Sequence, residues 1–327
     1  MNDAAAPLLQ IRDIRRVFTP RGAFFARAGG RHCVPAVNGV SLQVAERETY
    51  GLVGESGSGK TTTGRIAVGL DRPDSGQVLF RASGTGGLSP LVNVSKDLQM
   101  VFQDPYSSLN PRFRIGKTLE EPLAIHTDQN AAARRESVLN ILNKVGLSSG
   151  DALKFPHEFS GGQRQRIGLA RALILDPRLI VCDEPVSALD VSIQAQILTL
   201  LRQVQEELGL SFLFISHDLR VVRYVSDRIG VMYRGRLVEE AGADALFQTP
   251  LHPYTQTLLA SLPGLRQVGK TRGPRDLAPS ASRPDPRLSC PFHPRCARSL
   301  ERCRTEAPPL WSAAAGHKVA CFCARSL

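Results

Sequence analysis

The sequence predicts an α/β protein in which helices cover a sheet of parallel strands. Two apolar, strand-like runs at residues 179–182 and 211–215 are joined by a helix-like stretch at about 192–208. A helix of that length is the connection that parallel neighbouring strands require. Another apolar run, at 48–53, passes through a glycine-rich loop into a helix-like segment, so that strand, loop and helix follow in the order typical of a phosphate-binding unit.

Other segments add strands and a helical insertion to this core. Residues 115–172 have helical periodicity broken by Pro122, Gly146 and Pro156, which indicates helices inserted into the α/β domain. The glycine- and arginine-rich segment at about 20–34 predicts a surface loop. Further strands are expected at 8–14, 40–44, 76–80 and 98–102, and a hairpin at 229–239.

Charge and composition separate a large domain from a basic tail. The 327 residues carry a net charge of +11, and residues 251–327 hold 12 lysines and arginines against 4 acidic residues. Such a tail suits either a solvated surface or contact with anionic lipid headgroups. Residues 264–289 are almost free of periodicity and predict a linker. We expect an α/β domain at 1–250, with its helical insertion at about 104–172, and an extension at 251–327 with a cysteine module at 290–323.

The sequence contains no apolar run of about 18 residues, the length of a membrane-spanning helix. The N-terminus, Met1-Asn2-Asp3-Ala4, lacks the basic and then apolar order of a secretion signal. We therefore expect the protein to be made and kept in the cytosol. In that compartment the 7 cysteines would act as thiols or metal ligands and not as disulfides.

The glycine-rich loop has the pattern G-x-x-x-x-G-K-[ST], known as a P-loop. Its glycines allow a tight turn in which backbone N–H groups converge on phosphate oxygens at a helix N-terminus. Lys60 would reach the β- and γ-phosphates of a nucleotide, and the hydroxyl of Thr61 would ligate Mg²⁺. The residues expected to bind nucleotide here are Gly54, Glu55, Ser56, Gly57, Ser58, Gly59, Lys60, Thr61 and Thr62.

Two carboxylates follow the apolar run at 179–182. A strand end can place Asp183 beside the magnesium ion, while Glu184, one residue further, can polarise an attacking water as phosphoryl transfer requires. Such a pair alone is common at solvated strand ends, and the P-loop upstream is what makes it significant.

Another helix opens at Ser160-Gly161-Gly162-Gln163, with Ser160 suited to be its N-cap. A helix start with a serine and two glycines offers a second anion site. A single chain has no evident second nucleotide that this site could bind.

In combination these motifs resemble the ATPase subunits of ABC transporters, over nearly the whole chain. The family signature Leu-Ser-Gly-Gly-Gln here reads Phe159-Ser160-Gly161-Gly162-Gln163. The resemblance implies a P-loop NTPase fold: a RecA-like core sheet with helices on both faces, an antiparallel β-subdomain, an inserted helical subdomain and a small irregular C-terminal extension. It also implies that two subunits pack head to tail, so that the signature of one closes over ATP held by the P-loop of the other.

The resemblance implies roles for residues outside the P-loop. Gln103 matches the glutamine loop, which contacts Mg²⁺ or water and senses the membrane domains. His217 matches the switch histidine that contacts the γ-phosphate, and Asp190 matches the loop that couples the two sites and faces the partner. The implied catalytic residues are thus Glu184, His217 and Gln103, and the implied magnesium ligands are Thr61, Gln103 and Asp183.

An aromatic residue upstream of the P-loop stacks on adenine in this family. Phe18 is the expected residue, with Phe24 and Phe25 as competitors. An aromatic beside a strand is as often part of the core, so this alternative stays open.

Three further stretches resemble the oligopeptide, dipeptide and nickel permeases within the family. They are the glutamine loop from Val101 to Arg112, His252-Pro253-Tyr254-Thr255, and the segment from Cys290 to Cys296. The long loop before Val34 is more similar to the second, F-type ATPase subunit. This implies an ATP-hydrolysing importer subunit at the cytoplasmic face of the cell membrane, energising uptake of di- and oligopeptides, or alternatively of nickel or another small solute.

The implied partners are a second ATPase subunit, a paralogue of this one, and two transmembrane permease subunits. An extracytoplasmic solute-binding protein would take part indirectly. A soluble ABC ATPase acting on nucleic acid or ribosomes is a different class that only the net charge favours. Because the chain has one P-loop and no heptad run, we expect no nucleic-acid partner.

Four cysteines of the tail, Cys290, Cys296, Cys303 and Cys321, could meet if the prolines between them fold the chain back. Four thiolates suit a [4Fe-4S] cluster or a tetrahedral zinc ion, although the usual tight Cys-x2-Cys pairing is missing. Relatives with this tail imply the iron–sulfur cluster, and zinc or unligated thiols are the alternatives. Cys323 is expected to be spare.

Overall fold

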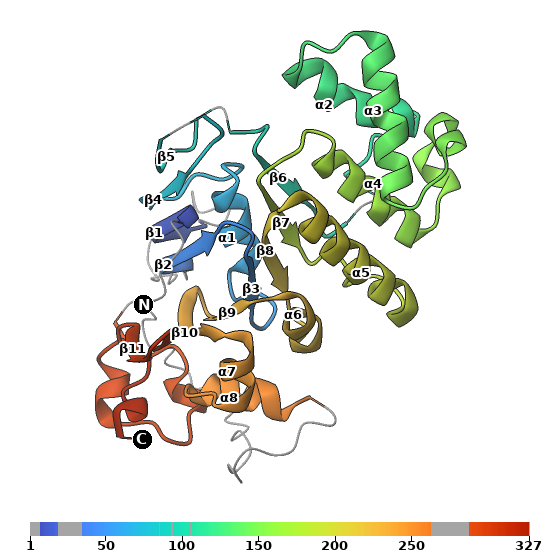
Figure 1. The fold of residues 1–327 in the computed structure, drawn as a ribbon. Helices are drawn as coiled ribbons and strands as arrows, with labels where there is room; N and C mark the ends of the chain where they lie inside the picture. Colours follow the sequence, from blue (N-terminus) through green and yellow to red (C-terminus); the bar gives the residue numbers. More distant parts are fainter. Residues whose placement is uncertain are drawn as a thin grey trace, which may run out of the picture.

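Two β-sheets packed against each other form the body of the protein, and a group of helices projects from one side (Figure 1). The structure is a computed structural model that describes residues 7–18, 35–84, 86–92, 94–104, 106, 108–262 and 288–326. No helix in these ranges is both long enough and apolar enough to cross a bilayer.

The larger sheet has eight strands in the order β11-β12-β10-β9-β3-β8-β7-β6. Its five strands from β9 to β6 are parallel, and the other three continue the sheet in antiparallel fashion. Every residue of β7 and β8 is buried, as expected for parallel strands covered on both faces. The strands are β3 (Thr49–Val53), β6 (Leu98–Val101), β7 (Leu179–Asp183), β8 (Ser211–Ser216), β9 (Arg228–Tyr233), β10 (Arg236–Gly242), β11 (Trp311–Ala314) and β12 (His317–Val319).

The two faces of this sheet bury different layers, because successive side chains of a strand point to opposite sides. Val181 and Leu213 belong to a core shared with the first helix and with the smaller sheet. Ile180 and Phe212 belong to the opposite core, which is shared with the helices that follow β7 and β8. The first layer contains α1 (Lys60–Ala67), β1 (Pro7–Val17), β2 (Pro35–Ala45), β4 (Ser75–Phe80) and β5 (Ser89–Pro90); the second contains α5 (Val191–Leu208), α6 (Leu219–Val225), α7 (Ala243–Gln248) and α8 (Pro253–Ala260).

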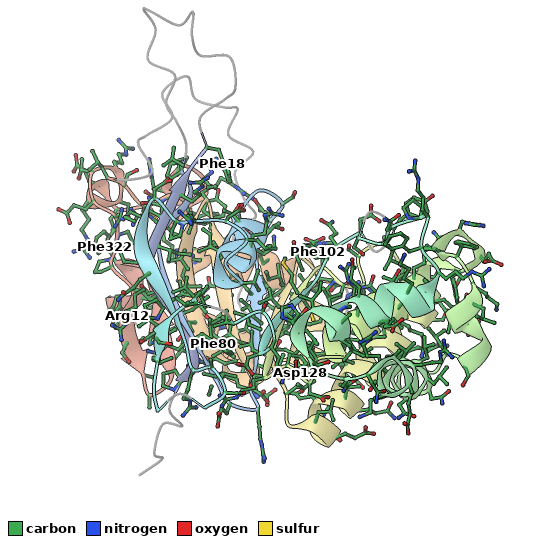
Figure 2. The ribbon with its side chains drawn as sticks, turned by 90° about the horizontal axis from the view of Figure 1, so that it is seen from above. Arg12, Phe18, Phe80, Phe102, Asp128 and Phe322 are labelled. Atoms are coloured by element: carbon green, nitrogen blue, oxygen red, sulfur yellow. The ribbon has the colours of Figure 1, made fainter. Side chains whose placement is uncertain are left out.

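The helical insertion between β6 and β7 projects beside the sheets, and Phe102 lies at the junction (Figure 2). It comprises α2 (Ile115–His126), α3 (Ala131–Lys144), α4 (Gly161–Leu173) and two short 3₁₀ turns at Ser149–Leu153 and Pro156–Glu158. The expected helix break at Pro122 is wrong, because α2 runs through this residue. A proline removes one backbone hydrogen bond, and the burial of Leu119 and Leu123 on either side holds the helix together.

The C-terminal extension is built into the larger sheet, which the sequence analysis did not anticipate. Strand β12 pairs with β10, the last strand of the preceding hairpin, at Glu239↔Val319 and Glu240↔Lys318. Glu239 is fully buried; it accepts from the backbone N–H groups of Leu251 (2.7 Å) and His252 (3.0 Å), and its Oε1 lies 2.8 Å from His317 Nε2. The extension is therefore joined to the sheet by backbone pairing and by a buried polar network.

His252 makes the stability of this region depend on pH. Its Nδ1 accepts the backbone N–H of Tyr254 at 3.0 Å and caps α8, so the ring must be neutral there. Burial lowers the pKa of His252 to about 4, whereas an unfolded histidine has a pKa of about 6.5. The folded protein thus binds fewer protons between these values. The contribution of His252 to the free energy of unfolding should therefore be fully present above about pH 6.5. The free energy of unfolding should fall by roughly 3 kcal/mol as the pH drops toward 4.

Urea denaturation at a series of pH values measures this effect. His252→Asn keeps a good N-cap residue but removes the titrating ring, so we expect a flatter pH dependence than in the wild-type protein. The exposed His157 offers a matched control, because His157→Asn should leave the dependence unchanged. Equal slopes for the wild-type protein and His252→Asn would contradict this account.

Candidate nucleotide site

The P-loop turns sharply between β3 and α1, and its glycines are sterically required. Gly59 adopts a φ of 100°, and a Cβ atom added there would lie 2.1 Å from the carbonyl oxygen of Ala36. Gly57 has a φ of 75°, in the left-handed region that favours glycine. The turn leads directly into the N-terminus of α1, where backbone N–H groups and the helix dipole favour an anion.

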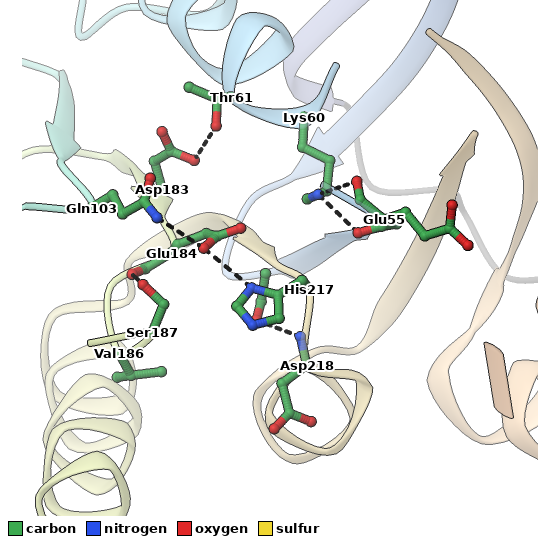
Figure 3. A network of polar contacts seen from close by, with 12 residues as sticks. Glu55, Lys60, Thr61, Gln103, Asp183, Glu184, Val186, Ser187, His217 and Asp218 are labelled. Carbon is green, nitrogen blue, oxygen red and sulfur yellow. Dashed lines mark hydrogen bonds and ion pairs between the residues drawn. The ribbon is translucent and has the colours of Figure 1, made fainter. Parts of the chain in front are cut away.

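Lys60 lies inside this turn, where it can meet phosphate oxygens. Its Nζ donates to the carbonyl oxygens of Gly54 at 2.8 Å and Glu55 at 3.0 Å (Figure 3). Burial lowers the pKa of Lys60, and the nearby carboxylates of Glu184 and Asp183 oppose that shift. The ammonium group is thus largely removed from water and available to a bound polyanion.

The side chains of Thr61 and Asp183 meet where a magnesium ion is expected. Thr61 Oγ1 donates to Asp183 Oδ1 at 3.0 Å (Figure 3). Asp183 ends β7 and is 4% exposed, and burial raises the pKa of its carboxyl group. A hydroxyl and a carboxylate from facing elements are oxygen donors of the kind that Mg²⁺ prefers, so both residues fit the ion.

The three predicted catalytic residues meet at the carboxylate of Glu184. Gln103 Nε2 donates to Glu184 Oε2 at 3.1 Å, and His217 Nδ1 lies 3.1 Å from the same oxygen (Figure 3). The backbone N–H of Glu184 donates to the carbonyl oxygen of Ile215 in the adjacent strand at 2.9 Å. The φ angle of Glu184 is 48°, which is uncommon for a residue other than glycine. This backbone turn aims the carboxylate toward the cavity instead of continuing the strand.

A cavity of about 680 Å³ contains most of the predicted site. Of the residues expected from the sequence, it is lined by Phe18, Gly54, Glu55, Ser56, Gly57, Gly59, Lys60, Thr61, Thr62, Gln103, Glu184 and His217. Ser58 and Asp183 are not among the lining residues, and both are buried. Sequence reasoning missed Ala36, Leu219 and Leu258, which also line the cavity and carry no recognisable motif.

Phe18 stands at the rim of the cavity with half of its surface exposed, 52%. The guanidinium carbon of Arg16 lies 5.2 Å from the centre of its ring. A partly exposed ring beside a phosphate-binding loop can stack on a base. The competing residues Phe24 and Phe25 lie outside the described part of the chain.

The signature residues lie apart from this cavity. Ser160 caps α4: its Oγ accepts the backbone N–H of Gln163 at 3.3 Å, and the Gln163 side chain accepts the N–H of Ser160 at 3.0 Å. Gly162 permits close packing, because a Cβ atom there would lie 2.4 Å from Ile193 of α5. None of Ser160, Gly161, Gly162 and Gln163 lines the Lys60 cavity, and Ser160, Gly161 and Gln163 face solvent.

Asp190 is exposed in the same way. It is the N-cap residue of α5, and its neighbour Val191 is 82% exposed. Exposed polar and apolar residues at two neighbouring helix starts form a surface that is open to a partner.

The cysteines of the tail converge on one small cavity. Cys290, Cys296, Cys303 and Cys321 line one small cavity, and Cys323, which was expected to be spare, lines it too. Burial raises the pKa of Cys290 to about 12. The space between the side chains is only about 10 Å³, and no group of three or more described His, Cys, Asp or Glu side chains is arranged to hold a metal ion. The donor atoms suit a metal centre, but a cluster would require the thiols to move apart.

This fold and this site define a P-loop ATPase: a polyphosphate cradle at Lys60, oxygen ligands for magnesium, and a carboxylate that can activate water. A sequence profile of the ABC transporter family matches residues 37–187, and a profile of the oligopeptide/dipeptide transporter C-terminal region matches residues 238–303. The chain belongs to the ABC transporter family, among the ATP-binding subunits of its oligopeptide and dipeptide branch.

Curated relatives and solved structures agree with this assignment. The chain is 47% identical to the oligopeptide transport ATP-binding protein AppF of Bacillus subtilis, over 96% of both chains. It is 43% identical to the dipeptide transport ATP-binding protein DppF of Haemophilus influenzae, over 97% of this chain and 96% of the relative. A dimeric structure of the ATP-binding cassette MJ0796 with ADP and Pi has a TM-score of 0.61 at 28% identity, covering 72% of this chain and 98% of that one.

Proposed function

We propose that this chain is the F-type ATPase subunit of an importer, and that it hydrolyses MgATP at the Lys60 cavity to drive uptake of di- and oligopeptides. The observation that carries the proposal is the convergence of Gln103 and His217 on one oxygen of Glu184, beside Lys60 and the Thr61–Asp183 pair. The names of the relatives, which are oligopeptide and dipeptide transport proteins, support peptides as cargo.

We propose a separate task for each side chain. Lys60 and the P-loop N–H groups bind the β- and γ-phosphates. Thr61 and Asp183, with Gln103, would hold the magnesium ion, which neutralises phosphate charge. Glu184 Oε2 accepts a proton from the attacking water, while His217, which lies 3.1 Å from that oxygen, contacts the γ-phosphate. Phe18 would stack on the adenine ring at the rim.

The second half of the catalytic pocket would come from another subunit. Ser160 and its helix N-terminus lie outside the cavity of their own chain and face solvent, as does Asp190. We propose that they close over ATP bound to a partner ATPase, a paralogue of this chain, whose own signature completes the Lys60 site. The related cassette MJ0796, described as dimeric, supports such pairing.

A cleft between the sheet and the helical insertion is the proposed contact with the permease subunits. The cleft has a volume of about 570 Å³ and is lined by Leu70, Phe102 and Ile125, whose exposed fractions are 52%, 38% and 68%. Gln103 directly follows Phe102 in the chain. A permease helix bound in the cleft would therefore affect the position of Glu184 through Gln103. We propose that the chain binds there at the cytoplasmic face of the cell membrane, with residues 1–250 as the ATPase unit and 251–327 as its extension.

Reconstitution tests the proposal. The chain is combined in vesicles with two permease subunits and a sister ATPase, in the presence of a solute-binding protein. Uptake of radiolabelled short peptides is then measured with ATP or ADP in the lumen that the ATPases face. We expect uptake with ATP only. ATP-driven uptake of nickel without uptake of peptides would overturn peptides as the cargo.

We also propose a [4Fe-4S] cluster at Cys290, Cys296, Cys303 and Cys321, with zinc as the alternative. The four thiols come from separate turns yet line one cavity, and thiolates are the usual ligands of such clusters. Protein purified without oxygen should be brown and contain about four irons per chain. Cys303→Ser should lose the iron, whereas Cys182→Ser, which removes a cysteine buried in β7, should keep it. A colourless sample with one zinc would reject the iron–sulfur cluster.

A further inference from the structure

An ion pair joins the C-terminal extension directly to the P-loop. Arg295 Nη1 lies 3.1 Å from both Oε1 and Oε2 of Glu55, and the two residues are 240 positions apart in the chain. Glu55 is the second residue of the P-loop and lines the nucleotide cavity. The same Arg295 nitrogen donates to the hydroxyl of Tyr233 at 3.5 Å. The extension therefore contacts the nucleotide site through the side chain of Arg295.

A second contact from the extension holds the backbone of the same residue. The N–H of Glu55 donates to the hydroxyl of Tyr254 at 2.9 Å, and Tyr254 is fully buried in α8. Its ring lies 4.5 Å from that of Tyr233 and 5.5 Å from that of Phe292, measured between ring centres. Three aromatic residues, from β9, α8 and the cysteine module, thus pack together and support the Tyr254 hydroxyl that holds Glu55.

The charge of Glu55 makes this support relevant to nucleotide affinity. A carboxylate that lines a cavity for a polyphosphate repels the ligand unless a cation compensates it. Arg295 supplies that cation. The Glu55 carbonyl also accepts from Lys60 Nζ at 3.0 Å, so a displaced Glu55 would disturb the lysine that binds phosphate.

We infer that Arg295 is a positioning residue through which the C-terminal extension sets the affinity of the P-loop for MgATP. It acts by neutralising Glu55 and holding it in place, without contact to the nucleotide. The inference rests on the proposed nucleotide site at Lys60. It makes the extension part of the ATPase site and not only an attachment to the sheet.

A double-mutant cycle on the full chain tests the inference. The dissociation constant of a fluorescent, non-hydrolysable MgATP analogue is measured for the wild-type protein, Arg295→Ala, Glu55→Gln and the double variant. We expect Arg295→Ala to weaken binding about 3- to 10-fold, since both partners are partly exposed and solvent screens them. In the Glu55→Gln background the same change should weaken binding less than about 2-fold.

Controls separate this effect from general damage. Arg304→Ala removes an exposed arginine of the same module that forms no ion pair with a described residue, and it should bind like the wild-type protein. Lys60→Met should weaken binding by roughly 10- to 100-fold; if its affinity is unchanged, the proposed nucleotide site is wrong. Loss of affinity by Arg295→Ala that is equal in both backgrounds, or no loss at all, would overturn the role of Arg295. A purely structural defect would not be rescued by Glu55→Gln.

Because coupling between two sites is reciprocal, nucleotide binding should also stabilise the extension against local opening. Binding of the MgATP analogue should slow amide hydrogen exchange in peptides that span residues 290–304. In Arg295→Ala, at saturating analogue, this protection should disappear while the P-loop peptides stay protected. Unchanged exchange of 290–304 in the wild-type protein on nucleotide binding would overturn the linkage.

Discussion

Glu184→Gln should reduce ATP turnover by about 10²- to 10⁴-fold, the range expected when a general base is removed. The amide has the same shape as the carboxylate but cannot accept a proton from water. Lys60, Thr61 and Asp183, the proposed ligands of the nucleotide and its magnesium ion, are unchanged by the substitution. Phosphate release at saturating MgATP, measured with the purified chain alone and with its partner ATPase, should therefore fall while the dissociation constant for MgATP stays within a few-fold of wild type.

A matched substitution shows whether the effect depends on position. Glu206 is an exposed glutamate of α5, and Glu206→Gln should hydrolyse ATP at the wild-type rate. Undiminished phosphate release by Glu184→Gln would remove Glu184 from the mechanism. Equal losses in turnover and in affinity would instead make it a binding residue.

Lys60→Met should weaken binding of MgATP by roughly 10- to 100-fold, because hydrogen bonds to a charged group contribute about 1.5–3 kcal/mol. Methionine preserves the apolar stem of the side chain and removes only the ammonium group. Since burial lowers the pKa of Lys60 and so opposes its charge in the free protein, the variant should fold normally. Titration with the fluorescent MgATP analogue measures the affinity, and thermal unfolding checks the fold.

The control is Lys96→Met, which replaces an exposed lysine on the segment before β6. It should bind the analogue like the wild-type protein. If Lys60→Met bound MgATP with unchanged affinity, phosphate recognition at the P-loop would have to be abandoned.

The α/β fold and the contents of the site were predictable because their signals are local. The P-loop needs glycine at positions such as Gly59, where the turn leaves no room for a side chain, and this need is visible in the sequence. The apolar runs that became β7 and β8 are buried throughout, as uninterrupted hydrophobic strands should be. The fold class and the family are confirmed, whereas the roles of the individual site residues stay predictions.

The contacts of the tail could not be predicted, because they join residues that are distant in sequence. Nothing around Arg295 indicates that its partner is Glu55, and the strand at 317–319 is too short to have a periodic pattern. The extension, which the family resemblance implied to be irregular, in fact contributes a hairpin to the sheet. Pro122 failed as a helix breaker for a related reason, since the packing of its neighbours outweighed its local preference.

The pairing of β12 with β10 has a consequence for any shortened form of this protein. A chain cut before residue 288 would leave the outer rim of β10 with unsatisfied N–H and C=O groups, and Glu239 without the imidazole of His317. Uncovered strand rims recruit strands from other molecules. The tail thus protects the ATPase from self-association through this strand edge. Deletions that aim to isolate the catalytic part should therefore yield soluble aggregates instead of monomers.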